Sequence, residues 1–237
     1  MFAGYPIVNS PDRIPVWAWR SAFVLALSAG LMTLGLLVAT LAGVADPQPF
    51  GALTAMDTFA DPSHWHLSAN GEPLAAPEPK NGRLELSMSA GSVVIGTYAN
   101  PIDCPCTVEL RAKQTAGGRD ARYGLWWGDA DGHPTMLAGV NSDGYMGIDS
   151  GPSGHAPAIM EWQLFPHVRS MGQVNDFRAD IDTHQVTVRL NDEVAARSPI
   201  EGSRRIWVGL FAQGSPRDAA QIGFLSFSVW ETKSSGS

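Results

Sequence analysis

The longest uncharged segment of the chain is residues 21–45, SAFVLALSAGLMTLGLLVATLAGVA, which lies between Arg20 and Asp46. A helix of this length rises about 37 Å, more than the ~30 Å hydrocarbon core of a bilayer. A cleaved signal peptide is the alternative, because Gly43-Val44-Ala45 resembles a small-residue cleavage site. Since the apolar region of a signal peptide is only about 7–15 residues long, the segment predicts a retained single-pass transmembrane helix.

The charges on either side of this segment predict its orientation. Arg13 and Arg20 precede it, whereas Asp46, Asp57 and Asp61 follow it. The positive-inside rule therefore predicts a cytoplasmic segment at residues 1–20 and a periplasmic or extracellular C-terminal part, anchored in the cytoplasmic (inner) membrane.

Small residues recur along the expected helix and let a neighbouring helix approach closely. They form two rows, one in each half of the segment: Ala22, Ala26 and Gly30, then Gly35, Ala39 and Gly43. The step from Gly30 to Gly35 changes the face, which favours contact with more than one helix of a membrane complex. The alternative is that small residues are simply common in membrane helices.

The net charge of the chain is −7, with +1 in residues 1–20 and −8 in residues 46–237. An acidic domain repels the phosphates of nucleic acids, which excludes them as partners. The segment 21–45 holds no side chain suited to bind haem or chlorophyll, and we expect no cofactor.

After a linker at residues 46–56, short β-type segments separated by Gly, Pro, Asn and Asp predict an all-β antiparallel sandwich, or jelly roll, over residues 57–231. A tail at residues 232–237 follows. The expected strands are 83–89, 92–98, 107–113, 123–128, 135–140, 144–148, 158–165, 176–181, 185–190, 205–212 and 222–230.

Alternation predicts which strand residues face the core. In 185–190 the apolar face holds Val186, Val188 and Leu190, and Asn191-Asp192 predicts a hairpin turn after this strand. In 222–230 strict alternation separates two sets of residues: Phe224, Ser226 and Ser228 on one face, and Leu225, Phe227 and Val229 on the other.

The order of these segments resembles the concanavalin A-like lectin/glucanase superfamily, in particular LamG-like and 3-keto-disaccharide-hydrolase-like domains. The resemblance covers about residues 57–231. It is carried by DTFADPSHW (57–65), GRLEL (82–86), CTVELRAK (106–113), RYGLWWGDADG (122–132), SDGYMGI (142–148), EW (161–162), VNDFRADIDTHQVTVRLNDEVA (174–195), IWVGLFA (206–212) and FLSFSVWE (224–231). It implies a sandwich fold and indicates little about activity.

Within YGLWWGDADGH (123–133), Tyr123, Leu125 and Trp127 are expected to face the core. Trp126 then points to the opposite face, which in this superfamily is often the ligand groove. With its neighbours Gly124 and Gly128 too small to cover it, we expect an exposed Trp126 to form a sugar- or partner-binding surface together with Tyr145 and Trp162. The alternative is that a loop covers Trp126.

Two short patterns contain metal-ligand residue types. Asp129 and Asp131 begin like a calcium loop, but the positions that an EF-hand fills with further ligands are His133 and Val140, so a plain turn explains the aspartates. His64 and His66 share one face of an extended segment and supply at most half of a zinc site. We therefore expect no bound metal.

Catalytic signatures are absent from the sequence. Glucanases of the superfamily use an E-x-D-x-x-E strand motif, whereas Glu109, Glu161 and Glu193 stand alone here. Glycosidases require two carboxyl groups about 5–9.5 Å apart. We therefore predict that the chain has no catalytic residues and is not an enzyme.

The two cysteines, Cys104 and Cys106, are too close for a metal knuckle and lack a second pair. A disulfide closing a tight loop and two buried thiols remain as alternatives.

Three functions are consistent with these observations. The first is a non-catalytic accessory subunit of a membrane protein complex, with the sandwich on the extracytoplasmic face. The second is a membrane-tethered carbohydrate-binding module. The third, implied by the resemblance alone, is a sugar hydrolase of the 3-keto-disaccharide-hydrolase type.

Overall fold

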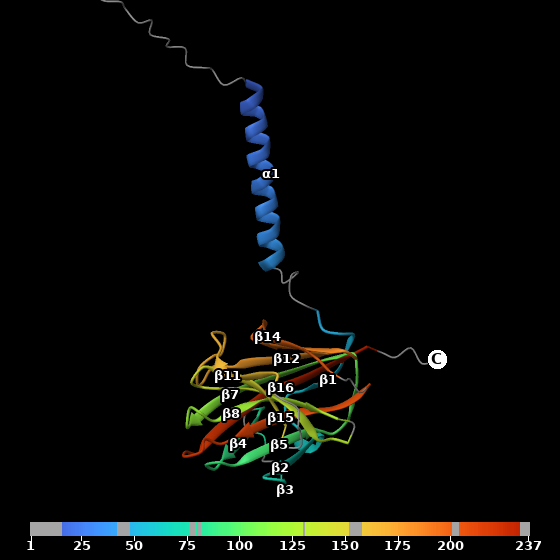
Figure 1. Ribbon diagram of the computed structural model, residues 1–237, viewed down its shortest axis with the longest axis vertical. Coiled ribbons are helices and arrows are strands. Elements are labelled where there is room, and N and C mark those ends of the chain that lie inside the picture. The colour runs from blue at the N-terminus through green and yellow to red at the C-terminus, as the bar shows by residue number, and fades with distance from the viewer. Residues whose placement is uncertain are drawn as a thin grey trace, which may run out of the picture. The chain divides into compact units, whose positions relative to one another are not determined.

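The computed structural model describes residues 16–41, 48–75, 79, 82–129, 131–151, 158–200 and 204–232. The chain divides into two units, Met1–Gln48 and Pro49–Ser237. The first contains one helix, and the second contains two antiparallel β-sheets (Figure 1). This confirms the expected fold class, a β-sandwich preceded by a single helix.

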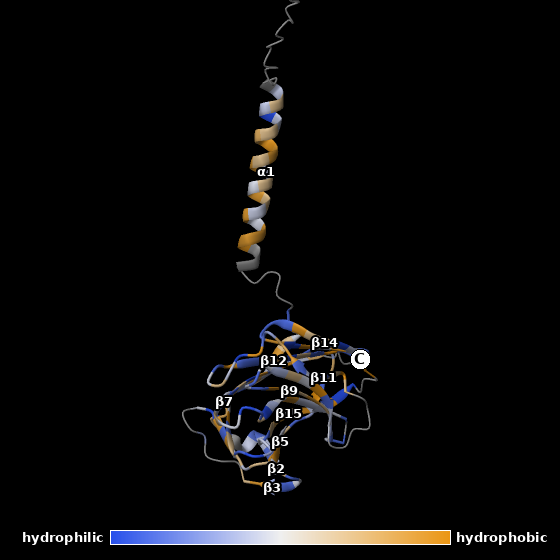
Figure 2. Ribbon diagram, turned by 60° about the vertical axis from the view of Figure 1, so that its left-hand side comes forward, coloured by the Kyte–Doolittle hydropathy of each residue, from blue (hydrophilic) through white to orange (hydrophobic). Residues whose placement is uncertain are grey.

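Helix α1 spans Val16–Leu41, so it begins before the expected segment at residues 21–45, whose last four residues lie outside the described part of the chain. The prediction counted only the uncharged run, but Trp17, Trp19 and Arg20 are compatible with a helix and extend it toward the N-terminus. Residues Trp17–Val38 are long and apolar enough to cross a membrane, a property shared by anchors and signal sequences. In Figure 2 the helix is mainly orange and pale.

The small residues of α1 are open to a neighbour. Ala22, Ala26, Gly30 and Gly35 are exposed, and no other atom of the chain lies near a Cβ placed on either glycine. Ala39 also belongs to the helix, whereas Gly43 lies outside the described residues. Helix–helix contacts through these rows therefore stay a prediction.

One sheet has seven strands in the order β1-β16-β7-β12-β13-β14, with β4 also paired to β16. Its strands are β1 (Ala52–Asp57), β4 (Leu84–Met88), β7 (Cys106–Gly117), β12 (Asn175–Ile181), β13 (Gln185–Leu190), β14 (Glu193–Pro199) and β16 (Ala220–Glu231). Strand β1 occupies the last five residues of the region expected to be a linker, residues 46–56, because Ala52–Asp57 pairs with the last residues of β16.

The other sheet has nine strands in the order β11-β10-β9-β8-β15-β5-β2-β3, with β6 also paired to β15. Its strands are β2 (Trp65–Ala69), β3 (Glu72–Leu74), β5 (Val93–Tyr98), β6 (Ile102–Asp103), β8 (Arg122–Gly128), β9 (Pro134–Asn141), β10 (Tyr145–Ser150), β11 (Met160–Leu164) and β15 (Arg205–Gln213). A short 3₁₀ turn, η1 (Pro62–His64), precedes β2.

Alternate residues of both sheets form one core between them. The expected face of β13 is confirmed, since Val186, Val188 and Leu190 are buried. The adjacent hairpin is confirmed as well. Asn191 and Asp192 both have positive φ, at 51° and 72°, as a two-residue hairpin turn with the twist of its strands requires.

The strict alternation expected for β16 is wrong. Its pairing with β7 shifts between Phe224 and Ser226, so one extra residue is accommodated there. Phe224 therefore faces the core together with Phe227 and Val229. A bulge of this kind reverses the inside–outside pattern beyond it.

Cys104, in the loop between β6 and β7, forms a disulfide with Cys106, the first residue of β7, and their Cα atoms lie 4.5 Å apart. Cys106 is completely buried, and Cys104 is 8% exposed. Of the two alternatives for these cysteines, the structure contains the bonded one.

Candidate ligand-binding face

The three residues expected to form a binding surface lie on neighbouring strands of the nine-stranded sheet. Trp126 is on β8, Tyr145 on β10 and Trp162 on β11, and β9 lies between β8 and β10. Pairing through Leu137 and Asp149 places all three side chains on the face turned away from the core. We call this the outer face of the nine-stranded sheet.

Trp126 is not exposed on this face, and that expectation is wrong. Its exposed fraction is 0%. The indole lies across the neighbouring strand β15, where a Cβ at Gly209 would collide with it, and Nε1 donates a hydrogen bond of 2.9 Å to the carbonyl oxygen of Gly96 on β5. The ring occupies the space beside Gly209, which has no side chain. The glycines beside Trp126 in sequence do not decide its exposure.

A row of glycines crosses the same face in register, with Gly124 opposite Gly139 and Gly139 opposite Gly147. Aromatic rings cover this row. A side chain at Gly139 would overlap the ring of Phe211, and one at Gly147 would overlap the indole of Trp162. Aromatic side chains of the same sheet therefore cover this row of glycines on the outer face.

Trp162 also belongs to a polar cluster with Arg122 and Asp149. The guanidinium carbon of Arg122 lies 4.2 Å from the centre of the Trp162 ring. Trp162 Nε1 donates to Asp149 Oδ2, and Arg122 Nη1 lies 4.0 Å from the same oxygen. A cation over an indole is attracted by the negative face of the ring, so the Trp162 indole is already engaged within the chain.

Tyr145 is the member of the expected surface that remains open. It is 38% exposed, and Leu164, its partner across β10 and β11, is 67% exposed. Together they place an aromatic and an aliphatic side chain at the β11 end of the outer face. Exposed aromatic and apolar groups of this kind are typical of contact surfaces.

The outer positions of β8 carry no carboxylate among the described residues. They are Arg122, Gly124, Trp126 and Gly128. Glu161 is exposed on β11, whereas Glu109 and Glu193 lie on β7 and β14 of the other sheet. Strand β8 thus does not carry the E-x-D-x-x-E pattern of the glucanase strand motif.

The loop after β8 brings Asp129, Asp131 and His133 together, with one ligand atom of each within 4.8 Å of the others. The arrangement has an internal explanation. Asp129 Oδ1 accepts hydrogen bonds from the backbone N–H groups of Asp131 at 3.0 Å and His133 at 3.1 Å. This is an Asx-type turn, which needs no ion.

His64 and His66 do not share a face, because His64 ends the η1 turn and only His66 belongs to β2. His64 Nδ1 lies 3.4 Å from Asp57 Oδ2. The buried Asp57 also accepts hydrogen bonds from the backbone N–H of Phe59 at 2.6 Å and from Trp65 Nε1 at 2.9 Å. These contacts give the DTFADPSHW segment a structural role.

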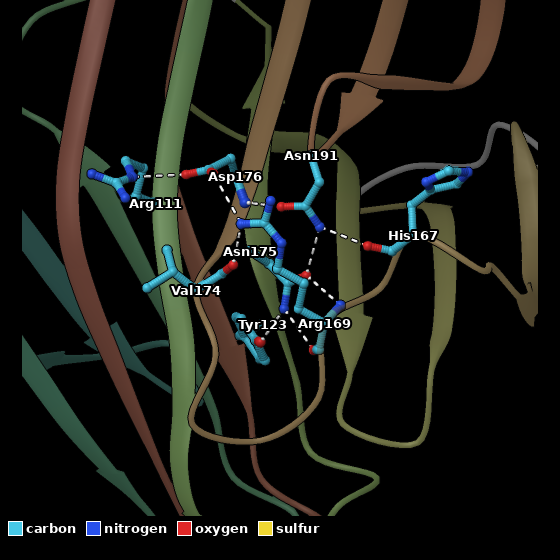
Figure 3. Close-up of polar contacts among 8 residues, drawn as sticks. All are labelled: Arg111, Tyr123, His167, Arg169, Val174, Asn175, Asp176 and Asn191. Carbon is cyan, nitrogen blue, oxygen red and sulfur yellow. Dashed lines mark hydrogen bonds and ion pairs between the residues drawn. The ribbon is translucent and has the colours of Figure 1, made fainter.

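A buried polar network, missed from the sequence, holds the loop between β11 and β12 (Figure 3). Asn175 Nδ2 donates to the Tyr123 hydroxyl at 2.9 Å and to the Arg169 carbonyl at 3.0 Å. Asn191 Nδ2 donates to the His167 carbonyl at 2.7 Å and to Asn175 Oδ1 at 3.0 Å. Burial raises the pKa of Tyr123. The network fixes the loop that directly follows Leu164.

The outer face of the seven-stranded sheet is built from ion pairs instead. Asp180 accepts from Arg178 Nε at 2.9 Å, and its other oxygen lies 3.5 Å from Arg189 Nε. Arg178 Nη1 also lies 3.8 Å from Glu109. Burial raises the pKa of Glu109, and three nearby aspartates add to the rise while Arg178 opposes it.

Each outer face has one hollow. On the seven-stranded sheet a cavity of ≈ 240 Å³ is lined by Glu109, Arg111, Asp176, Phe177, Arg178 and Asp192. Near the β3 edge of the nine-stranded sheet a hollow of ≈ 490 Å³ is lined by Trp65, His66, Leu67, Ser68, Gly71, Pro73, Leu74 and Thr97.

No family model and no curated protein matches this chain. Solved structures do. The endo-1,3-β-glucanase (laminarinase) catalytic domain of Thermotoga petrophila RKU-1 is 14% identical, with a TM-score of 0.58, over 78% of this chain and 100% of that one. The endo-β-1,3-glucanase of Pyrococcus furiosus is 12% identical, with a TM-score of 0.57, over 78% of this chain and 98% of that one.

The carbohydrate recognition domain of Emp47p is 13% identical, with a TM-score of 0.54, over 76% of this chain and 97% of that one. The domain has the concanavalin A-like fold. The sandwich therefore shares its architecture with a carbohydrate recognition domain and with endo-β-1,3-glucanases, as the order of its sequence segments predicted. At these identities the similarity extends to the fold alone.

Proposed function

We propose that this protein is a non-catalytic, membrane-anchored binding module. Helix α1 is the anchor, the N-terminus is cytoplasmic, and the sandwich lies on the extracytoplasmic side of the inner membrane. The length and apolar character of Trp17–Val38 support the anchor, and the arginines before it support the orientation.

The observation that carries the non-catalytic assignment is the outer face of the nine-stranded sheet. Its β8 positions hold no carboxylate, and Trp126 is completely buried. A face filled by its own side chains does not enclose a sugar chain. It does offer a firm surface for contact with another macromolecule.

We further propose that the partner is a membrane protein complex in which this chain is an accessory subunit. The exposed small residues of α1 support helix packing, and Tyr145 with Leu164 supports contact by the sandwich. The test is purification from native membranes in mild detergent. Gly30→Leu and Gly35→Leu should each lower the yield of co-purified partners, whereas Leu27→Ile on the same helix should not.

Carbohydrate binding is the second candidate. It is favoured by Tyr145, whose exposed ring lies on the same face as the Arg122–Trp162–Asp149 cluster, and by the fold shared with a carbohydrate recognition domain. A bound sugar should change tryptophan fluorescence, and Tyr145→Ala should abolish that change. Leu53→Ala, which alters an exposed residue of the other sheet, is the matched control.

Hydrolysis is tested separately. Asp149 and Glu161 lie on paired strands, so they are the carboxylates to examine on this face. We expect no release of reducing sugar from β-glucans by the purified chain. Turnover that disappears in Glu161→Gln would show that the protein is an enzyme.

A further inference from the structure

The disulfide loop lies where three parts of the sandwich meet. Asp103 N–H donates to Glu231 Oε1 at 2.8 Å. The carbonyl oxygen of Pro105, the residue between the two cysteines, accepts from Thr232 N–H at 3.2 Å and from the Thr232 hydroxyl at 3.0 Å. The loop therefore holds the C-terminal end of β16 by contacts on both sides of Cys104.

The residue after the loop extends these contacts to the start of the unit. Thr107 is buried, and its hydroxyl accepts a hydrogen bond of 2.9 Å from Phe50 N–H while donating one of 2.7 Å to Asp180 Oδ1. Strand β1 begins two residues after Phe50, and its first residue, Ala52, pairs with Glu231. The first described residues of the sandwich and the last ones are thus held at the same place.

The entropy that this disulfide removes from the unfolded chain does not explain its position. A disulfide stabilises a fold mainly by restricting the unfolded chain, and this effect grows with the length of the closed loop. The two cysteines here are only two residues apart, so the restriction is close to the smallest that a disulfide can impose. What the bond does constrain is the shape of the Asp103–Thr107 loop, and through it the contacts to β1 and β16.

We propose that the Cys104–Cys106 disulfide is a redox-sensitive clasp that controls how firmly β1 and the end of β16 are held. Reduction by a dithiol breaks the one S–S bond and forms two thiols, while the dithiol gives up two electrons and two protons and becomes a disulfide. Attack occurs at Cys104, because Cys106 is completely buried. The proposal concerns the sandwich itself and is independent of which ligand the protein binds.

The experiment compares the oxidised and reduced full-length chain in detergent. Maleimide labelling before and after dithiothreitol treatment counts the free thiols, and amide hydrogen exchange is followed by mass spectrometry. Reduction should accelerate exchange in residues 50–57 and 226–232 by roughly tenfold, because contacts that close these segments are weakened. The hairpin at residues 185–199, whose strands pair with β12 and with each other, is the internal control.

A second measurement keeps the test independent of folding problems in a variant. The Cys104→Ser/Cys106→Ser double variant should reproduce the exchange of the reduced chain, and re-oxidation of the native chain should restore slow exchange. Unchanged exchange at residues 50–57 after complete reduction would overturn the proposal. So would equal acceleration in the control hairpin, or two free thiols in the untreated protein.

Discussion

The two sheets of the sandwich close their outer faces in different ways. On the seven-stranded sheet, Arg178 and Arg189 share the carboxylate of Asp180 across adjacent strands. On the nine-stranded sheet, the rings of Trp126, Phe211 and Trp162 lie over glycines of neighbouring strands. The outer face of the seven-stranded sheet depends on charged side chains that must remain paired. The outer face of the nine-stranded sheet depends on glycine positions that must carry no side chain.

This difference predicts different responses to substitution. On the outer face of the nine-stranded sheet, a side chain added at one of these glycines would overlap the aromatic ring beside it. This face therefore tolerates almost no added volume. A face built on ion pairs tolerates changes in shape but not the loss of a shared charge, because Arg178 and Arg189 then both lose the Asp180 carboxylate.

The largest effect is expected at Gly209. A side chain there would collide with the Trp126 ring and with the backbone of Gly96. Gly209→Val should lower the free energy of unfolding by about 3 kcal/mol or more. Urea unfolding of the full-length chain, followed by circular dichroism, measures it. Gly223→Ala is the control, since a Cβ there has only ordinary contacts; equal losses in both variants would contradict the role of Gly209.

The next effect is expected on the ion-paired face. Asp180 is 11% exposed and receives hydrogen bonds from Arg178 and Thr107. Asp180→Ala should lower the free energy of unfolding by about 3 kcal/mol, because it leaves half-buried guanidinium groups without this carboxylate. Asp103, 65% exposed beside Arg205, is the comparison, and Asp103→Ala should cost less than about 1 kcal/mol. Similar losses of unfolding free energy in the two variants would show that burial of the carboxylate does not increase its contribution to stability.

The smallest effect is a change in the pH dependence of stability. Burial raises the pKa of Glu109 above its ordinary value of 4.5, so the folded chain binds this proton more tightly than the unfolded chain. Stability is therefore lost as pH rises from about 4.5 through the raised pKa. Glu109→Gln should remove that loss and raise the free energy of unfolding at pH 7 by less than about 1 kcal/mol, since the carboxyl is partly exposed. A variant less stable than the native chain at pH 7 would contradict the sign.

Local patterns predicted those parts of the fold that depend on neighbours in sequence. Val186, Val188 and Leu190 alternate with polar residues, and Asn191-Asp192 has the turn chemistry of a hairpin, so both were identified correctly. The face of Phe224 was not, because the bulge in β16 is set by its pairing with β7, which is distant in sequence.

The exposure of the candidate surface residues was predicted less well for the same reason. The exposure of Trp126 depends on Gly209 and Gly96, which are its neighbours only after three strands have paired. The network around Asn175 likewise joins residues from β8, β12 and two loops. No feature of sequence spacing indicates such contacts, whereas the resemblance in segment order was sufficient for the fold.

The position of Trp126 also makes its indole N–H a natural probe of whether the nine-stranded sheet is intact. Its ring starts on β8, crosses β15 and ends in a hydrogen bond to β5, so its Nε1–H is released only when those three strands separate. The indole proton should therefore exchange with solvent at the rate of global unfolding of the sandwich. A single resonance in a nuclear magnetic resonance spectrum would follow the integrity of the whole nine-stranded layer, without any label added to the chain.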